Sequence, residues 1–255
     1  MIRFAALGSG SRGNAMAVQS AQTTVLIDCG FGPRELTRRL GRLGLAIDDV
    51  DAILITHEHS DHIGGAAACT RRFGVPLFMT HGTHVAGLAG AEDLKVTRID
   101  SHTSFAIGDF EVQPFPVPHD AREPAQFTLS DGKCRFGMLT DIGTSTPHVV
   151  EMLSMCDALV LECNHDAEML ARGNYPHALK QRISGRFGHL ENSASAQLLA
   201  QLDTARLQHV VAAHLSEQNN SADLVRHALA SVMKCDPSWI GVADQDEGSD
   251  WRMID

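Results

Sequence analysis

The sequence predicts an α/β fold, and two features of its hydrophobic pattern support that prediction. Short apolar runs of strand length alternate along the chain with segments whose apolar residues recur at helical spacing. No apolar run approaches the roughly 20 residues that a membrane span needs. With 255 residues, 44% of them hydrophobic, the chain can bury the core of one large domain without disulfide bonds.

The first part of the chain contains mostly strands, with two helices between them. Proline begins the first of these helices, which has Leu36, Leu40 and Leu43 on one face and glycine after its end. A Gly/Ser-rich loop, residues 8–14, follows the first strand. The predicted strands are Ile2–Leu7, Ala15–Gln19, Thr23–Asp28, Asp51–Thr56 and Pro76–Met79, and the predicted helices are Pro33–Leu43 and Asp61–Phe73.

The second part repeats this alternation. Strands are predicted at Glu111–Phe115, Gln126–Leu129, Cys134–Thr140, Ala158–Glu162 and Leu207–Ala213, helices at Pro147–Met155, Glu191–Gln201 and Ala222–Met233, and final strands near Trp239–Val242 and Trp251–Ile254. The run Asp51–His59 resembles Asp157–His165, and Thr24–Asp28 resembles residues 136–141. Two readings stay open: either halves of about residues 1–100 and 101–255 arose by duplication, or buried strands simply look alike.

The composition indicates an acidic protein with reduced cysteines. A net charge of −10 argues against a basic surface coat for non-specific nucleic-acid binding, but it allows a local basic groove. None of the six cysteines forms a C-x-x-C pair, and the N-terminus lacks a secretory signal pattern, so we expect a cytoplasmic protein. The 14 histidines point instead to metal binding, because imidazole is the commonest transition-metal ligand.

A histidine-rich motif follows the predicted strand Asp51–Thr56. The run His57-Glu-His-Ser-Asp-His62 places four potential ligands within six residues, and two glycines follow shortly after it. The sites of α/β proteins tend to open at such carboxyl ends of buried strands. Alternation along the extended chain puts His57 and His59 on one side, and the turn into a helix lets Asp61 and His62 face a neighbouring point. One patch can therefore offer ligands for two metal ions.

The motif His57-x-His59-x-Asp61-His62 resembles the signature of the metallo-β-lactamase fold superfamily, and the resemblance covers essentially the whole chain. It implies a single domain over residues 1–255 with a four-layer αββα sandwich, in which two mixed β-sheets pack face to face and helices cover their outer faces. It also places a metal centre at one edge of the sheets.

The resemblance further implies how two divalent ions, Zn²⁺ or Mn²⁺, would be bound and used. A hydroxide between the two ions would be the nucleophile, and Asp61 counts among both the ligands and the catalytic residues. Asp28 would either orient the ligands from behind or cap a turn. The ligands would be His57, His59 and His119 for one ion, Asp61, His62 and His214 for the other, and Asp141 as the bridge.

The late motifs Gly188–Asn192 and Ala213–Ser216 are similar to those of the RNase Z-like and YycJ/WalJ-like branches of the superfamily. This resemblance implies phosphodiester cleavage, in which His189 donates a proton to the leaving oxygen and Glu162 orients it. His189 could instead be a residue that merely lies beside a helix N-terminus. The YycJ/WalJ-like subgroup is associated with 5′-to-3′ exonuclease activity on double-stranded DNA.

Contacts with substrate phosphates are expected from two segments. The Gly-rich loop with Ser11 and Asn14 offers backbone N–H groups, and Lys180 and Arg182 belong to a basic cluster ahead of His189. Three hypotheses remain: a DNA or RNA exonuclease, a small-molecule phosphodiesterase or another hydrolase of this fold such as a thioesterase or lactonase, and a non-catalytic metal-binding protein. The sequence predicts no oligomeric state.

Overall fold

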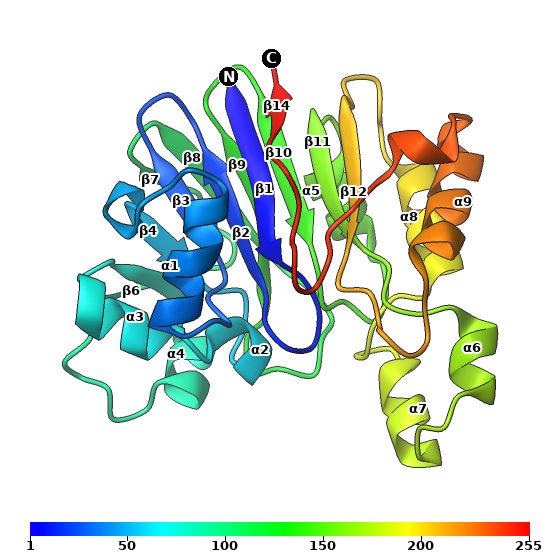
Figure 1. Ribbon diagram of the computed structural model, residues 1–255, viewed down its shortest axis with the longest axis horizontal. Helices are drawn as coiled ribbons and strands as arrows, with labels where there is room; N and C mark the ends of the chain where they lie inside the picture. Colours follow the sequence, from blue (N-terminus) through cyan, green and yellow to red (C-terminus); the bar gives the residue numbers. More distant parts are fainter.

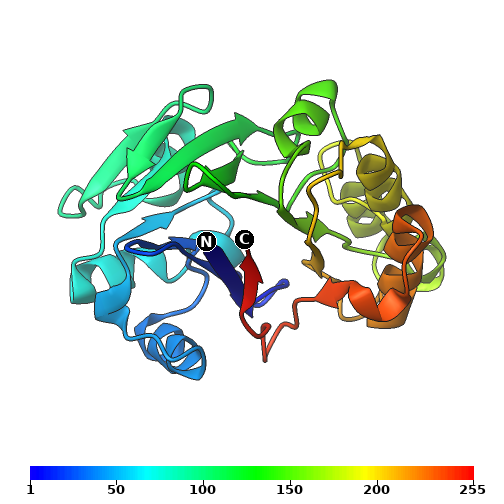
Figure 2. The ribbon, with the colours of Figure 1, turned by 90° about the horizontal axis from the view of Figure 1, so that it is seen from above.

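Two mixed sheets of seven strands each form the centre of the computed structural model, which describes residues 1–255 (Figures 1 and 2). Helices cover the outer faces of both sheets, so the predicted αββα sandwich is confirmed. In spatial order, the first sheet contains β14 (Arg252–Ile254), β1 (Ile2–Gly8), β2 (Ala15–Gln19), β3 (Thr24–Ile27), β4 (Ala52–Leu54), β5 (Leu77–Thr80) and β6 (Val96–Ile99). The second contains β7 (Phe105–Ile107), β8 (Phe110–Pro116), β9 (Ala125–Ser130), β10 (Arg135–Leu139), β11 (Ala158–Glu162), β12 (His209–Ala213) and β13 (Gly241–Val242).

Both sheets use the same pattern of strand pairing. Read from β14 and from β7, the first three pairs in each sheet are antiparallel and the last three are parallel. Only the C-terminal strand β14 departs from chain order, because it returns to the first sheet and pairs with β1. The two sheets therefore share one plan, although the origin of that plan stays a prediction.

Apolar side chains from the two inner faces interlock between the sheets. Phe4 of the first sheet and Phe136 of the second are fully buried, with ring centroids 4.9 Å apart. Each sheet has one further apolar cluster, which lies between the sheet and the helices on its outer face. This arrangement follows from the parallel strands, which are apolar on both faces and must be covered on both.

Nine α-helices complete the fold, and none of them is long and apolar enough to cross a membrane. They are α1 (Pro33–Arg42), α2 (Ser60–Ile63), α3 (Ala66–Phe73), α4 (His81–Gly87), α5 (Pro147–Leu153), α6 (Ala167–Arg172), α7 (His177–Ile183), α8 (Asn192–Gln201) and α9 (Ala222–Met233), together with short 3₁₀ helices at Ile47–Asp49 and Pro237–Trp239.

One predicted helix is wrong in its extent, because residues 61–73 form two helices instead of one. The helix is interrupted at Gly64-Gly65, where the backbone lies against the loop after β3. A Cβ atom on Gly65 would lie 1.8 Å from the carbonyl oxygen of Phe31, so only glycine permits this approach. The break lets the short helix α2 direct Asp61 and His62 inward while α3 packs on the sheet.

Three polar residues leave the parallel strands in a left-handed backbone conformation. Asp28 follows β3 with a φ of 66°, Asp141 follows β10 with a φ of 53°, and His214 follows β12 with a φ of 56°. Side chains other than glycine seldom adopt this region, and such residues cluster at functional sites. The three exits lie at one edge of the sandwich, where the histidine motif after β4 also lies.

Candidate metal centre

Three histidine side chains converge at the end of β4. His57 Nε2 lies 3.0 Å from His59 Nδ1, which lies 3.3 Å from His119 Nε2. His57 and His119 are buried, whereas His59 is partly exposed at the cleft. The three ring nitrogens lie close enough together to serve as candidate ligands of one transition-metal ion.

A second group of ligands lies beside the first. Asp61 Oδ2 is 3.4 Å from His62 Nε2 and 3.5 Å from His214 Nε2. His62 and His214 are buried, and the rings of His57 and His62 have centroids 4.2 Å apart. Two ligand groups therefore share one continuous cluster.

Asp141 stands between the two groups. Its Oδ2 lies 3.1 Å from His62 Nε2, and its Oδ1 lies 3.8 Å from His119 Nε2. Asp141 Oδ2 and His214 Nε2 are nevertheless fully buried without any hydrogen-bond partner. Burying such polar atoms unpaired costs free energy, and a cation between them would remove that cost. These orphaned atoms fit a divalent metal centre with Asp141 at its middle.

Hydrogen bonds behind the ligands fix which ring nitrogen each histidine offers. His62 Nδ1 donates to Asp28 Oδ2 at 2.7 Å, because a carboxylate can only accept, and this leaves Nε2 for a metal. Asp28 also accepts from the Thr56 hydroxyl at 2.9 Å, and that hydroxyl in turn accepts from His57 Nδ1 at 2.9 Å. His119 Nδ1 donates to the carbonyl oxygen of Gly188 at 3.1 Å. Asp28 thus orients two ligands, one of them through Thr56.

Buried carboxylates give the cluster a strongly negative character. Burial raises the pKa of Asp141, but the charges of His214 and His62 outweigh it and hold that pKa well below its ordinary value. Conversely, burial lowers the pKa of His214, but the nearby carboxylates of Asp141, Asp61 and Glu162 raise it to about 10. Without metal, protons on histidine balance the carboxylates, and a divalent ion would displace those protons.

A histidine–glutamate pair lies at the edge of this cluster. His189 Nδ1 donates to Glu162 Oε1 at 2.8 Å, and His189 is partly exposed to the cleft. Glu162 Oε2 accepts from two backbone N–H groups, those of Ile142 and Leu190. Burial lowers the pKa of His189, but the charge of Glu162 and its hydrogen bond more than compensate, so the pKa is raised. His189 can therefore hold a proton on the nitrogen that faces the cleft.

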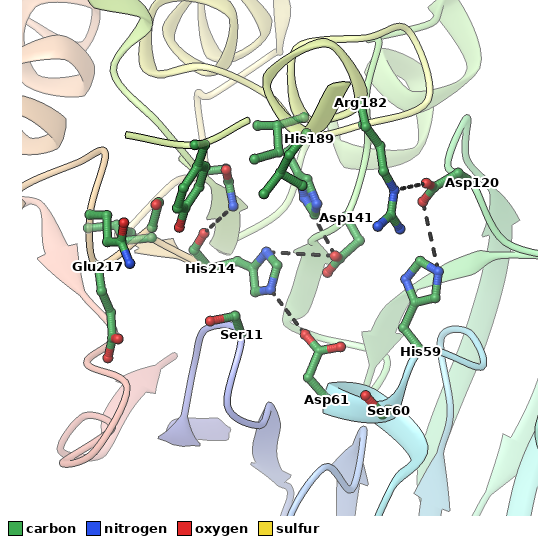
Figure 3. Close-up of a pocket in the computed structure, with 18 residues that line it drawn as sticks. Ser11, His59, Ser60, Asp61, Asp120, Asp141, Arg182, His189, His214 and Glu217 are labelled. Carbon is green, nitrogen blue, oxygen red and sulfur yellow. Dashed lines mark hydrogen bonds and ion pairs between the residues drawn. The ribbon is translucent and has the colours of Figure 1, made fainter. Parts of the chain in front are cut away.

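The cluster opens into a cleft of about 480 Å³ (Figure 3). Asp61 and His59 reach into it from one side, and Arg182 of α7 reaches in from the other. Arg182 Nε donates to Asp120 Oδ2 at 2.6 Å, which raises the pKa of the guanidinium and leaves its other nitrogens facing the space above Asp141. The cleft thus combines candidate metal ligands, a proton donor and a cation.

The four residues predicted to contact substrate lie in different places. Ser11 and Arg182 line the cleft. Asn14 is buried, and its side chain contacts Asp61 Oδ2 at 3.2 Å. Lys180 does not line the cleft, because its Nζ donates to the carbonyl oxygen of Ala171 at 2.7 Å.

The amides of the Gly-rich loop are largely used within the protein. Those of Gly10, Arg12 and Gly13 bond to Asn14 Oδ1, Gln245 Oε1 and the carbonyl oxygen of Gly10. The loop therefore supports the position of Asp61 rather than presenting its amides to the cleft.

Sequence reasoning missed three contributors to the cleft. Thr56 connects Asp28 to His57, and its place directly before the first ligand was the available signal. Asp120 follows His119 directly and pairs with Arg182, 62 residues further along the chain. Tyr175 also lines the cleft, from the turn between α6 and α7, and nothing in the strand–helix pattern indicated that this segment folds over the site.

Comparisons with known proteins agree with this geometry. The family model of the β-lactamase superfamily domain matches residues 23–214. The chain is 32% identical to the exodeoxyribonuclease YycJ of Bacillus anthracis, over 99% of this chain and 97% of the relative. It is 30% identical to the exodeoxyribonuclease WalJ of Streptococcus pneumoniae serotype 2, over 99% and 93%. The crystal structure of the metallo-β-lactamase fold protein YhfI from Bacillus subtilis superposes with a TM-score of 0.73 at 15% identity, covering 98% of each chain.

Proposed function

The chain belongs to the metallo-β-lactamase superfamily and to its YycJ/WalJ-like family, and from this premise we propose that it is a metal-dependent exodeoxyribonuclease. One observation carries the proposal: His189 is held by Glu162 at the rim of the candidate metal cluster, 3.6 Å from Asp141 Oδ1. Cleavage of a phosphodiester expels an alkoxide, which benefits from a positioned proton donor.

His189 performs the acid step in this proposal. The new bond forms between phosphorus and the oxygen of a water molecule, and the bond from phosphorus to the leaving oxygen breaks. The proton on the cleft-facing Nε2 of His189 passes to that leaving oxygen, while Nδ1 keeps its bond to Glu162. The attacking water loses a proton to bulk solvent and His189 regains one from it, so that one water molecule is consumed overall. Glu162, already held by two backbone amides, stabilises the charged imidazole without moving.

The remaining cleft residues would bind and orient the phosphate. Divalent ions held by His57, His59, His119, Asp61, His62, His214 and Asp141 would supply a nucleophile from water at neutral pH and offset negative charge on phosphorus oxygens. Arg182, fixed by Asp120, has guanidinium nitrogens free for a non-bridging oxygen. Ser11 lines the opposite rim.

The ligand chemistry supports zinc or manganese, because it consists of imidazole and carboxylate groups without thiolate. We propose two ions, since the ligands form two groups joined by Asp141. All six cysteines are free, five of them buried, which suits a reducing compartment such as the cytoplasm.

The charges around the cleft favour a second candidate, a phosphodiesterase that acts on small molecules. The net charge is −10, and Arg12 and Arg182 near the cleft already pair with acidic side chains. Long nucleic acids gain affinity from many phosphate contacts to basic residues, whereas Arg182 is the one arginine or lysine that lines the cleft. This candidate uses the same metal centre and the same proton donor.

The two candidates separate in one experiment. Metal-loaded protein is incubated with 5′-labelled duplex DNA and, in parallel, with bis-p-nitrophenyl phosphate. The proposal predicts release of labelled nucleotides, which His57→Ala abolishes. Turnover of the small ester without nucleotide release would reject the nuclease and support the small substrate. Unchanged DNA cleavage by His57→Ala would reject the metal mechanism.

A further inference from the structure

Helix α7 presents an apolar surface that no part of the hydrophobic core covers. Leu179 and Ile183 lie four residues apart, hence on one face of the helix, and both line the cleft together with Tyr175. We call these three residues the apolar wall. None of them packs in any of the three core clusters, and α7 contains no buried residue. The three side chains are only partly buried, so part of their apolar surface faces the cleft.

The apolar wall is held firmly in place. Lys180 Nζ donates to the carbonyl oxygen of Ala171, which ties α7 to the end of α6. Gly173 sits where a Cβ atom would lie 2.4 Å from Asn219 Oδ1, so the chain is packed closely just before Tyr175. No hydrogen bond joins the Tyr175 hydroxyl to another protein group, so removing the hydroxyl should leave the position of the ring unchanged.

The apolar wall continues directly into the proton donor. The N–H of His189 donates to the carbonyl oxygen of Ile183 at 2.8 Å, so the end of α7 sets the position of the His189 backbone. The carbonyl oxygen of Phe187, in the same connection, accepts from the N–H of Asp120 at 3.0 Å. The wall and the His189 side chain also line the same cleft, so a group bound on the wall would lie close to the leaving oxygen that His189 is proposed to protonate.

We propose that the apolar wall binds the nucleobase of the leaving nucleoside, so that the enzyme acts on an unpaired terminal nucleotide. This inference rests on the proposed function and names the substrate group for the same site. A base is the flat, weakly polar part of a nucleotide, and aromatic and aliphatic side chains stack on it without regard to its identity. The cleft of about 480 Å³ has the size of a small-ligand pocket, which admits one nucleotide and not a duplex.

A consequence is that the terminal base pair must open before cleavage. Stacking on Tyr175 replaces the stacking that the terminal base loses in the duplex. Recognition through stacking also requires few phosphate contacts, which agrees with the acidic charge of the chain. Binding of the base by the wall is thus compatible with a nuclease whose net charge is −10.

The test compares matched DNA ends that carry either a normal terminal nucleotide or an abasic tetrahydrofuran analogue. Wild-type kcat/KM should favour the base-bearing end by roughly 5- to 150-fold, the range expected for loss of one stacked base. Tyr175→Ala should lose this preference by slowing the base-bearing end alone. Tyr175→Phe should behave as wild type because the ring remains. Leu224→Ala, which truncates an exposed apolar side chain on α9, is the matched control.

Equal slowing of both DNA ends by Tyr175→Ala would overturn the inference, since it would indicate a merely structural role. No effect on either end would overturn it as well. An equilibrium measurement separates this inference from the nuclease proposal: calorimetric binding of dAMP and of 2-deoxyribose 5-phosphate to metal-loaded protein. If wild type cuts no DNA, the proposed function fails. In that case, the inference about the apolar wall is still supported if dAMP binds more tightly than 2-deoxyribose 5-phosphate by a similar factor and Tyr175→Ala removes the difference. Equal affinities for the two compounds would overturn it.

Discussion

Asp51 and Asp157 occupy the same position in the two halves of the molecule. Asp51 accepts a hydrogen bond from the N–H of Thr24, the first residue of β3, and its own N–H donates to the carbonyl oxygen of Thr24. Asp157 makes the same two bonds with Arg135, the first residue of β10. In both halves, the same pair of hydrogen bonds therefore joins the starts of two neighbouring parallel strands.

The halves differ where these strands end. Asp28 comes four residues after Thr24, whereas Asp141 comes six residues after Arg135. Two residues of extended chain add up to about 7 Å, so the second aspartate reaches further beyond the sheet edge. Asp28 is satisfied by Thr56 and His62, while Asp141 keeps a buried oxygen without a partner. One fold thus turns the same residue type into an orienting group in one half and a candidate ligand in the other.

The largest expected effect comes from removing the aspartate that stands among the ligands. Asp141→Asn should lower metal content below that of wild type and reduce turnover by roughly 10³-fold or more, because a negative charge at the centre of the proposed ligand set is lost. Elemental analysis of dialysed protein, with circular dichroism as the folding control, measures this. Wild-type metal content together with full activity would show that Asp141 is no ligand.

His189→Ala tests the proposed proton donor, which lies in the second half. Turnover of DNA should fall by roughly 10²- to 10⁴-fold while metal content stays unchanged, since the proposed role of His189 is to donate a proton and not to bind an ion. Hydrolysis of bis-p-nitrophenyl phosphate should fall much less, because p-nitrophenolate leaves without protonation. His177→Ala, on the exposed start of α7, is the control. Loss of metal would refute the acid role.

Asp28→Asn tests the orienting aspartate of the first half. Metal affinity or activity should fall by roughly 10- to 100-fold, the effect typical of groups that orient metal ligands. The physical reason is that an amide NH₂ would replace one of the two oxygens that accept from Thr56 and His62. Metal titrations followed by activity measure the shift. An effect as large as that of Asp141→Asn would erase the proposed difference between the halves.

The smallest effects should come from the two aspartates that bond to the strand starts, Asp51 and Asp157. Their removal should change only the stability of the protein. Asp157→Ala should lower the free energy of unfolding by about 1–3 kcal/mol, since it leaves the N–H of Arg135 and the Arg206 guanidinium without their buried acceptor. Asp51 is exposed, so Asp51→Ala should cost less, about 1 kcal/mol. Urea unfolding midpoints compare the two. A clear loss of metal in either variant would contradict a purely structural role.

The sequence predicted much of the fold because parallel strands with two buried faces leave clear apolar runs. Four ligand candidates of the first motif were also evident, since they lie within six residues. The segment Ala167–Ile183 was not predicted, because its helices are short and bury only Leu170. In α7, Leu179 and Ile183 line a cleft and belong to no core cluster, so the periodic signal that reveals a core-facing helix is weak.

The geometry of the site depended on long-range contacts that one sequence does not display. The pairing of Arg182 with Asp120 joins residues 62 apart, and the meeting of His214 with Asp61 joins opposite halves. Lys180 shows the converse limit: its charge suggested a phosphate contact, but its ammonium group ties two helices together. Charge predicts what a side chain can do, and only packing decides where it points.

Titration of metal-free protein with Mn²⁺ or Zn²⁺, followed by nucleotide release from 5′-labelled DNA, tests the central claim most directly. If two ions bind and share Asp141 as a ligand, activity should rise to a plateau at two equivalents of metal per chain. Asp141→Asn should fail to reach that plateau at the same metal concentrations. A plateau at one equivalent, or DNA cleavage by protein stripped of metal, would contradict the account.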